Sequence, residues 1–329
     1  MVSPHEKLHA TLKMRCVRVE LADLSRLADF LQLETNTSKI AVAGTALSLH
    51  LSAFPVLVEV LSCWSTLRKV RGSGPEHVQD WIDAVAVIEY MQRNQEAKAD
   101  ELPIREVSAR LFKDSKRIER ITAQLDVLLS GSIESEVRQS SDVWREIGLG
   151  REEQPVRMAG AVVIRRTRLT SILDEPYAGF PASSVLGVEG HPDYVLTIEN
   201  QTTFHTEAKR RCMENVLLIY TAGMPSPSWC AMYERLLSSI SADVPIRHWG
   251  DVDEGGFRIA AYIASTAANA GRTLSPYRMS PDDVPEGARV KADDGKAARM
   301  GDFAKKAGWY ELAAAILDLK FTAEQESLG

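Results

Sequence analysis

The part of the sequence that decides the fold reads Tyr194-Val-Leu-Thr-Ile-Glu-Asn200, then Val216-Leu-Leu-Ile-Tyr-Thr-Ala-Gly-Met-Pro-Ser226, then Ile246-Arg-His-Trp-Gly-Asp-Val-Asp-Glu-Gly-Gly256. Each segment begins with a short hydrophobic run and continues into a polar motif. Short runs rich in β-branched and aromatic residues, bounded by Gly, Pro and Asn, are typical of strands. Helix-like patterns separate the runs, which predicts βαβ units and a mostly parallel sheet. The expected fold class is α/β.

Acidic side chains follow two of these strands. Glu199 ends the first run, and Asp251 and Asp253 follow the third. Ligands bind beyond the carboxyl ends of strands in such sheets, so we expect the carboxylates to converge there. Carboxylates held close together repel one another, which raises their pKa values, and a bound divalent cation offsets this repulsion. Mg²⁺ prefers oxygen ligands and takes one or two carboxylates with waters or phosphates.

The spacing within Asp251-Val-Asp253 suits a metal site, because two residues separated by one share a face of an extended strand. Val252 would then point back into the core, and Gly255 and Gly256 would allow a phosphate to approach the backbone. Taken alone, this pattern also fits a solvated loop. A Glu at one strand end and Gly-Asp-x-Asp-x-Gly at a later one is more specific.

This combination resembles the Toprim domain of topoisomerases, primases and related nucleases. The resemblance narrows to one family when further motifs are included. The motifs Glu199-Asn200 with Phe204, Gly223-Met-Pro-Ser226, Gly250-Asp-Val-Asp253 and Glu324-Gln-Glu326 together look like JetD, the nuclease family of Wadjet plasmid-defence systems. The resemblance covers the chain from about Pro103 to the C-terminus.

The resemblance implies a metal-dependent DNA endonuclease that uses Mg²⁺ or Mn²⁺. It assigns Glu199 as general base or bridging ligand and Asp251 and Asp253 as metal ligands. Glu324 and Glu326 would either join the metal site or be ordinary charges at a helix end. The family also implies a homodimer, double-stranded plasmid DNA as substrate, and a condensin-like SMC–kleisin complex as partner.

The composition is that of a globular protein, with 329 residues of which 45% are hydrophobic and 26% charged. A net charge of −6 excludes a protein that coats DNA by bulk positive charge, so DNA must be contacted locally or delivered by a partner. No apolar run is long enough to span a bilayer, and the first residues lack the apolar core of a signal peptide. Four scattered cysteines fit a reducing compartment, and we expect a cytoplasmic protein.

Residues 1–99 carry helical patterns and form the first expected domain. Apolar residues repeat along one helix face in residues 20–33, and residues 40–60 are apolar on most sides with a break at Pro55. A further helix over residues 76–94 has a stripe formed by Trp81, Ala84, Val85, Ile88 and Met91. This region is either a plain helical bundle or a docking or dimerisation arm.

A second domain is expected over residues 100–180, before the Toprim domain at 181–329. Helices at 105–111 and 115–129, followed by a strand at 161–164, fit a winged-helix module. Two basic clusters of the module and one beside the catalytic edge could contact DNA phosphates: Lys113, Lys116 and Arg117, then Arg165, Arg166 and Arg168, and finally Lys209, Arg210 and Arg211. The alternative is that these residues form solvated faces paired with nearby acids.

The same module bears on mechanism. The A subunit of type IIB topoisomerases, a distant relative by resemblance, carries an attacking tyrosine after an Arg-acid-hydrophobic motif. Here Arg105-Glu-Val107 is followed by Ser108 and Ala109. The sequence therefore predicts hydrolysis without a tyrosyl–DNA bond.

Two other functions compete with this interpretation. A phosphotransferase of the haloacid-dehalogenase type also places Asp-x-Asp after a strand, but after its first strand and usually before Thr or Ser. Here Glu254 follows the motif and two strands precede it. The second alternative is a regulatory or DNA-binding subunit with an inactive Toprim site, against which the intact acidic residues count.

Overall fold

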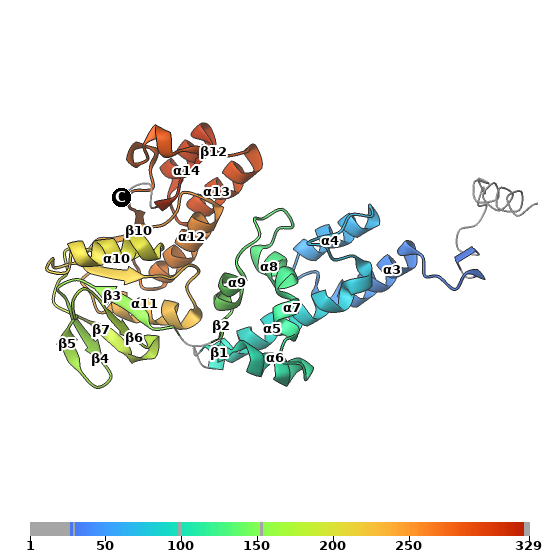
Figure 1. Cartoon of the computed structure of the whole chain (residues 1–329), viewed down its shortest axis with the longest axis horizontal. Coiled ribbons are helices and arrows are strands. Elements are labelled where there is room, and N and C mark those ends of the chain that lie inside the picture. Colours follow the sequence, from blue (N-terminus) through green and yellow to red (C-terminus); the bar gives the residue numbers. More distant parts are fainter. Residues whose placement is uncertain (1–26, 29, 98–100, 152–153, 326–329) are drawn as a thin grey trace, which may run out of the picture. The chain divides into compact units, whose positions relative to one another are not determined.

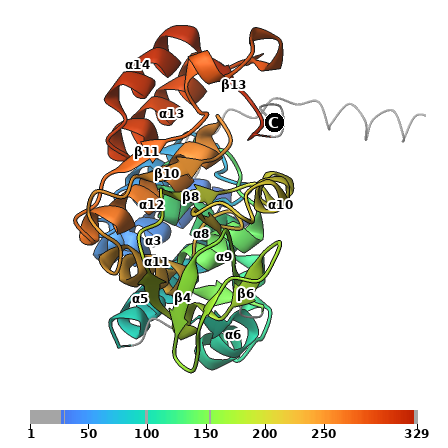
Figure 2. The same ribbon diagram turned by 90° about the vertical axis from the view of Figure 1, so that its left-hand side faces the viewer.

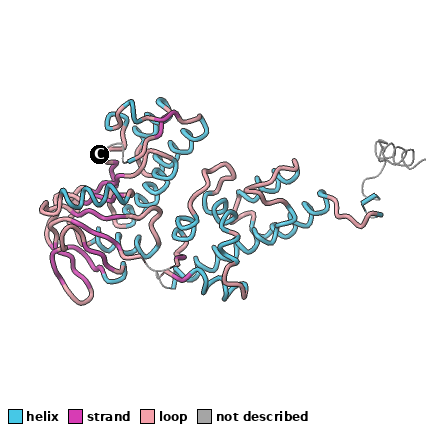
Figure 3. Tube along the Cα trace, viewed as in Figure 1, coloured by secondary structure: helices cyan, strands magenta, loops and turns pink. Residues whose placement is uncertain are grey.

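The computed structural model describes residues 27–28, 30–97, 101–151 and 154–325 (Figure 1). Helices and strands alternate through the C-terminal part of the chain, whereas the N-terminal part is helical (Figure 3). The chain divides into two compact units, Met1–Val78 and Gln79–Gly329. The division into domains at residues 99 and 180 stays a prediction.

The N-terminal unit contains the helices α3 (Asn36–Leu47) and α4 (Val56–Ser65), joined through the short 3-10 helix η1 (Ser48–His50). The Thr35 hydroxyl caps α3 by accepting a hydrogen bond from the Ser38 N–H at 3.1 Å. Pro55 immediately precedes α4, so the predicted break is confirmed. The helix expected at 20–33 lies mostly outside the described residues.

Helix α5 (Val78–Ala97) carries the stripe predicted from the sequence. All five of its members are buried: Trp81, Ala84, Val85, Ile88 and Met91. The spacing of three and four residues between them places one face of the helix in a core, as expected for an amphipathic helix.

The next segment holds a two-stranded parallel sheet and four helices. In chain order these are β1 (Leu102–Pro103), α6 (Ile104–Phe112), α7 (Arg117–Arg120), α8 (Thr122–Ser130), α9 (Ser140–Glu146) and β2 (Leu149–Gly150). The single helix expected over residues 115–129 is instead interrupted at Ile121, which ends α7. Arg138, whose side chain is only 10% exposed, binds both Asp126 on α8 and Glu146 on α9, which fixes these helices to each other. The winged-helix assignment stays a prediction.

A six-stranded mixed sheet confirms the α/β class. Its strands are β3 (Val156–Ala159), β6 (Ala178–Phe180), β8 (Val195–Ile198), β9 (Leu217–Tyr220), β10 (Ile246–Trp249) and β11 (Leu274–Pro276), in the order β11-β10-β8-β9-β3-β6. The neighbours β11, β10, β8 and β9 run parallel, and β3 and β6 add antiparallel pairs at one edge. Residues 174–193, which are rich in Pro and Gly, contain β6 and β7 (Val185–Glu189), which complete sheet edges.

Helices cover both faces of the parallel strands. The connection from β8 to β9 is α10 (Gln201–Arg210), and those after β9 and β10 are α11 (Pro227–Ser238) and α12 (Glu254–Asn269). Figure 2 shows α10 on one side of β8 and α12 on the other. All four residues of β8 are buried, which explains why this strand is continuously apolar apart from Thr197.

Smaller elements complete the C-terminal part of the chain. The strands β4 (Val163–Arg166), β5 (Thr170–Ile172) and β7 form an antiparallel sheet. Helices α13 (Asp294–Lys306) and α14 (Tyr310–Leu319) follow α12, and β12 (Val290–Lys291) pairs with β13 (Phe321–Thr322). Within the described part of the chain, no helix has both the length and the apolar character that crossing a membrane requires.

Candidate active site

The adjacent ends of β8 and β10 bring the predicted acidic residues together. These strands pair in parallel, and the Glu199 N–H donates to the Trp249 carbonyl at 3.0 Å. Glu199 therefore begins the loop after β8 directly beside the loop after β10. The Asp251 N–H lies 3.4 Å from Glu199 Oε2. The predicted convergence of Glu199 and Asp251 is present in the structure.

Sheet topology explains why a crevice lies at this point. The connection leaving β8 leads to β9 on one side, whereas the connection leaving β10 leads to β11 on the other. Two neighbouring parallel strands whose connections diverge form a topological switch point, where α/β proteins bind ligands.

The Asp-x-Asp segment departs from an extended strand, because β10 ends at Trp249. Asp251 Oδ1 accepts a hydrogen bond from the Gln325 N–H at 2.6 Å. Asp253 Oδ1 accepts one from the Gly256 N–H at 2.7 Å and so caps α12. Both aspartates are half-buried, with fully buried Val252 between them pointing into the core as predicted.

Close packing leaves little room for a side chain at two glycines of the motif, most strictly at Gly256, where the nearest atoms are backbone. A Cβ at Gly250 would lie 2.6 Å from Glu199 Oε2 and 2.9 Å from His248 Nε2. A Cβ at Gly256 would lie 2.1 Å from the Asp251 carbonyl oxygen. The absence of a side chain at Gly256 allows this close approach of the acidic loop's backbone, and the predicted approach of a phosphate stays a prediction.

The electrostatics of the edge are unfavourable for a bare carboxylate. Burial raises the pKa of Glu199 well above its ordinary value, and the charges of Asp251 and Asp253 raise it further. A proton or a cation near Glu199 therefore stabilises this arrangement.

His248, fully buried on β10, is a packed residue of the sheet. Its Nδ1 lies 2.9 Å from the Thr197 hydroxyl, which itself donates to the Arg247 carbonyl at 3.1 Å. We therefore assign the ring proton to Nδ1 and a lone pair to Nε2. Burial lowers the pKa of His248 to about 3, so the ring is neutral.

The C-terminal segment reaches the acidic loop. Val252 and Ala323 form a backbone bridge with hydrogen bonds of 2.8 and 3.0 Å. The next residues are Glu324, which is exposed, and Gln325, which is buried and accepts a hydrogen bond from the Asn200 N–H at 2.9 Å. Glu326 lies outside the described residues. The C-terminal segment contacts the acidic loop most closely through the Gln325 N–H, which the sequence did not single out, and the role of Glu324 in a metal site stays a prediction.

Sequence reasoning also missed Asp142. It lies on α9, far upstream of the sheet, and its Oδ1 approaches to 2.6 Å from where Gly223 would carry a Cβ. Burial raises the pKa of Asp142, and its charge contributes to the raised pKa of Glu199. No pattern around Asp142 marks it, because its proximity to the sheet arises only from tertiary packing.

The predicted DNA-binding cations of the helical segment differ in how they are used. Lys113 and Lys116 are exposed. Arg117 is mostly buried and forms ion pairs of 2.7 Å with both Asp80 and Asp83 on α5. Arg117 therefore joins two helices, and its availability to DNA is lower than that of the lysines.

The two remaining basic clusters show the same division. Arg165 and Arg168 are exposed near the β4–β5 turn, whereas Arg166 lies over the Phe180 ring at 4.4 Å. In the other cluster Lys209 and Arg210 are exposed, and Arg210 lies 3.4 Å from the Glu207 carboxylate. Arg211 binds the buried Glu207 at 2.5 Å and also Glu214 at 3.0 Å.

The donor set of the acidic edge fits a hard cation held by few protein ligands. No group of three or more His, Cys, Asp or Glu side chains among the described residues is placed to hold one metal ion. Glu199 and Asp251 nonetheless both supply a carboxylate at this edge, with the Asp251 N–H 3.4 Å from Glu199 Oε2, and Mg²⁺ in proteins commonly takes one or two carboxylates.

Ser108, which the predicted resemblance aligns with a topoisomerase tyrosine, is a structural residue. It is fully buried, and its hydroxyl donates to the Asp114 carbonyl at 2.6 Å and accepts from the Ile118 N–H at 3.1 Å. Neither contact would activate it as a nucleophile.

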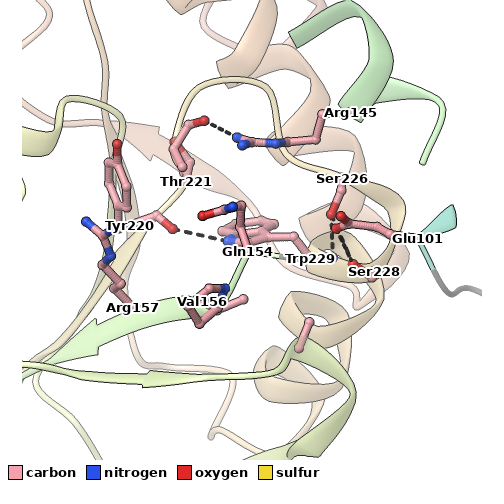
Figure 4. A pocket seen from close by; sticks show the side chains of 13 residues that line it. Glu101, Arg145, Gln154, Val156, Arg157, Tyr220, Thr221, Ser226, Ser228 and Trp229 are labelled. Carbon is pink, nitrogen blue, oxygen red and sulfur yellow. Dashed lines mark hydrogen bonds between the residues drawn. The ribbon is translucent and has the colours of Figure 1, made fainter. Parts of the chain in front are cut away.

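A small pocket lies beyond the end of β9 (Figure 4). Ser228 on α11 donates to Glu101 at 2.7 Å, and Arg145 reaches the loop after β9 and donates to the Ala222 carbonyl. The cavity volume of about 40 Å³ accommodates ordered water but no nucleotide. The pocket is therefore not the candidate substrate site.

Comparisons with known proteins agree with the motifs. Residues 157–304 match the family model described as Wadjet protein JetD, C-terminal. A relative named Wadjet protein JetD, from Bacillus cereus (strain Q1), is 27% identical over 248 residues. The alignment covers 70% of this chain and 58% of the relative, so the chain spans somewhat more than half of that protein's length. These matches confirm the resemblance to the JetD family.

Proposed function

From this relationship to the JetD family, we propose that the chain is a component of a Wadjet-type plasmid-defence system and acts in it as a Toprim metal-dependent DNA endonuclease. The observation that carries the proposal is the convergence of Glu199 and Asp251 at the switch point between β8 and β10. The family match spans both residues. Asp253 stands two residues further on, at the start of α12.

Mg²⁺ or Mn²⁺ at this edge would supply charge stabilisation at the scissile phosphate and lower the pKa of an attacking water. Glu199 and Asp251 would bind the cation, with Asp253 completing the acidic loop. Glu199 is also the candidate general base, because burial and its acidic neighbours keep its proton affinity high. Cleavage products should carry free ends with no protein attached, since Ser108 and Ala109 occupy the tyrosine positions.

The charge distribution supports delivery of DNA by a partner. The net charge is −6, and two of the predicted DNA-binding arginines, Arg117 and Arg211, already bind carboxylates. We propose that a condensin-like SMC–kleisin complex brings plasmid DNA to a homodimer of this chain, in which each of two sites cuts one strand.

One observation favours a second candidate function, a DNA-binding subunit with an inactive Toprim site. Asp251 and Asp253 each accept a backbone hydrogen bond, from Gln325 and Gly256. In an inactive subunit these bonds would be the whole role of the aspartates. The phosphotransferase alternative is less favoured, because the motif follows β10, after β8 and β9 in the chain.

The test is plasmid cleavage by the purified chain with Mg²⁺ or Mn²⁺, alone and with a condensin-like SMC–kleisin complex of a Wadjet system. We expect metal-dependent cleavage that Asp251→Asn removes, since Asn keeps an oxygen acceptor for Gln325 but loses the charge. Glu189→Gln, an exposed change in the separate β4–β5–β7 sheet, should cut like wild type. Cleavage that persists in Asp251→Asn would exclude this site. Metal-independent DNA binding without any cleavage would favour the inactive subunit.

A further inference from the structure

Helix α9 is held on the loop after β9 by two side chains. The Arg145 guanidinium donates to the Ala222 carbonyl. Asp142 accepts a hydrogen bond from the Met224 N–H, and its Oδ1 lies 2.6 Å from the Cβ position of Gly223. Gly223 has a φ of 80°, and any side chain there would collide with this carboxylate. The loop is thus shaped to receive Asp142.

This loop begins beside Glu199. Strand β9 is the parallel neighbour of β8, and the Thr221 N–H donates to the Ile198 carbonyl at 3.0 Å. Since β10 lies on the other side of β8, three adjacent strand ends are each met by a carboxylate. In sheet order these carboxylates are Asp251 after β10, Glu199 after β8, and Asp142 resting on the loop after β9.

A second feature, independent of the carboxylates, also faces this edge. The Nε2 of fully buried His248 has no hydrogen-bond partner within the described residues. It lies 2.9 Å from the Cβ position of Gly250, and Glu199 Oε2 lies 2.6 Å from the same point. A buried lone pair without a partner is costly, so this nitrogen is suited to a donor such as a metal-bound water.

We propose that Asp142 is a carboxylate ligand for a second cation of the metal centre, shared with Glu199. This inference rests on the proposed function and deepens it. Because Mg²⁺ commonly takes only one or two carboxylates, a row of carboxylates at three adjacent strand ends fits two ions that are each held by a pair. Glu199 stands in the middle of the row and would belong to both pairs, as in two-metal sites.

Because Asp142 lies on α9 and Glu199 follows a strand of the sheet, a cation bound by both would link two parts of the fold. Asp142 belongs to α9, which Arg138 ties to α8 through Asp126 and Glu146. A cation bound between Asp142 and Glu199 would therefore join this helical segment to the sheet. Metal binding should slow amide hydrogen exchange in residues 140–146.

The experiment uses Mn²⁺ alone and the full chain, with two readouts that need no cleavage. Calorimetric titration should give two sites per chain in wild type. In Asp142→Asn one site should weaken by about tenfold or more, while the Asn oxygen still accepts the Met224 N–H. Exchange mass spectrometry should show metal-dependent protection of α9 in wild type and its loss in Asp142→Asn. Glu189→Gln should match wild type in both readouts.

The outcomes separate this inference from the proposed function. Equal binding and equal α9 protection in wild type and Asp142→Asn, with binding lost in Asp251→Asn, would overturn the role of Asp142 and leave the proposed function standing. Absence of Mn²⁺ binding in wild type would overturn both. Arg145→Met removes the other contact that holds α9 on the β9 loop, and this variant should still bind two Mn²⁺ ions. If Arg145→Met also loses one Mn²⁺ ion, the packing of α9 rather than the Asp142 carboxylate determines binding, and the role of Asp142 as a ligand is overturned.

Discussion

The acidic edge and the basic clusters both consist of charged residues selected from the sequence. The acidic residues converge in the structure, whereas several of the basic residues form ion pairs within the protein. Glu199 and Asp251 come from distant parts of the chain and meet at one sheet edge. Arg117 and Arg211 lie within short basic runs, but each is held by carboxylates of the protein itself.

This contrast shows which sequence patterns predict where a side chain lies in the folded protein. Parallel strands bring their carboxyl ends to one edge, so the neighbours of a residue just after a strand follow from the strand pattern itself. A run of Lys and Arg predicts a positive charge but not whether each side chain faces solvent or an acidic partner in the protein. The side chain that faces an acidic partner becomes structural, and its neighbour stays free.

The largest expected effect tests the acidic edge. Glu199→Gln should reduce metal-dependent plasmid cleavage by at least about a hundredfold, because metal stabilisation of the transition state is worth several kcal/mol and each 1.4 kcal/mol is tenfold. Initial rates measured with the partner complex provide the comparison. A less than tenfold loss would remove Glu199 from the proposed metal centre.

The next effect tests the structural role of a basic residue. Arg211→Met should lower the free energy of unfolding by about 3 kcal/mol, since it leaves the buried Glu207 carboxylate with only the longer contact to exposed Arg210. The exposed neighbour in the same cluster is the control, and Lys209→Ala should change stability by less than about 0.5 kcal/mol. Chemical denaturation measures both. Similar small values for the two variants would show that the Arg211 contacts contribute little.

A pH-dependent effect connects stability to the acidic edge. The raised pKa of Glu199 means that the metal-free folded state keeps a proton that the unfolded state has lost. That contribution is complete below the ordinary carboxyl pKa and is lost as pH rises through the raised value. Without metal, the melting temperature of Glu199→Gln should therefore exceed that of wild type increasingly as pH rises from about 5 to 8. A constant difference across this range would contradict the burial of Glu199.

The smallest effect separates free cations from paired ones. Replacing exposed Lys113 and Lys116 with Ala should reduce the slope of log affinity for DNA against log salt by up to about two, since each phosphate contact contributes about −0.9. Arg117→Ala should change the slope less, because its guanidinium binds Asp80 and Asp83. Fluorescence anisotropy at several salt concentrations gives the slopes. If only Arg117→Ala alters the slope, the ion pairs of Arg117 open when DNA binds, and Arg117 rather than the exposed lysines contacts phosphate.

Sequence reasoning located the three hydrophobic runs, the α/β class and the acidic residues, because strand periodicity and strand-end motifs are local signals. It did not locate Asp142 or Gln325. Both reach the edge through tertiary packing, Asp142 by the docking of α9 on the β9 loop and Gln325 by the bridge between Val252 and Ala323. The pairing of Arg117 with α5 was equally invisible, since its acidic partners lie more than thirty residues upstream.

The central claim is that the edge formed by Glu199, Asp251 and Asp253 binds a divalent cation. Thermal melting of wild type, Asp251→Asn and Asp253→Asn with and without Mn²⁺ tests it most directly. Binding to the folded state alone raises its stability, so wild type should melt at a higher temperature with Mn²⁺. Asp251→Asn, which loses a ligand charge, should gain little or nothing, and Asp253→Asn, which loses a neighbouring charge of the same loop, should gain less than wild type. Equal Mn²⁺-induced shifts in all three proteins would contradict the claim.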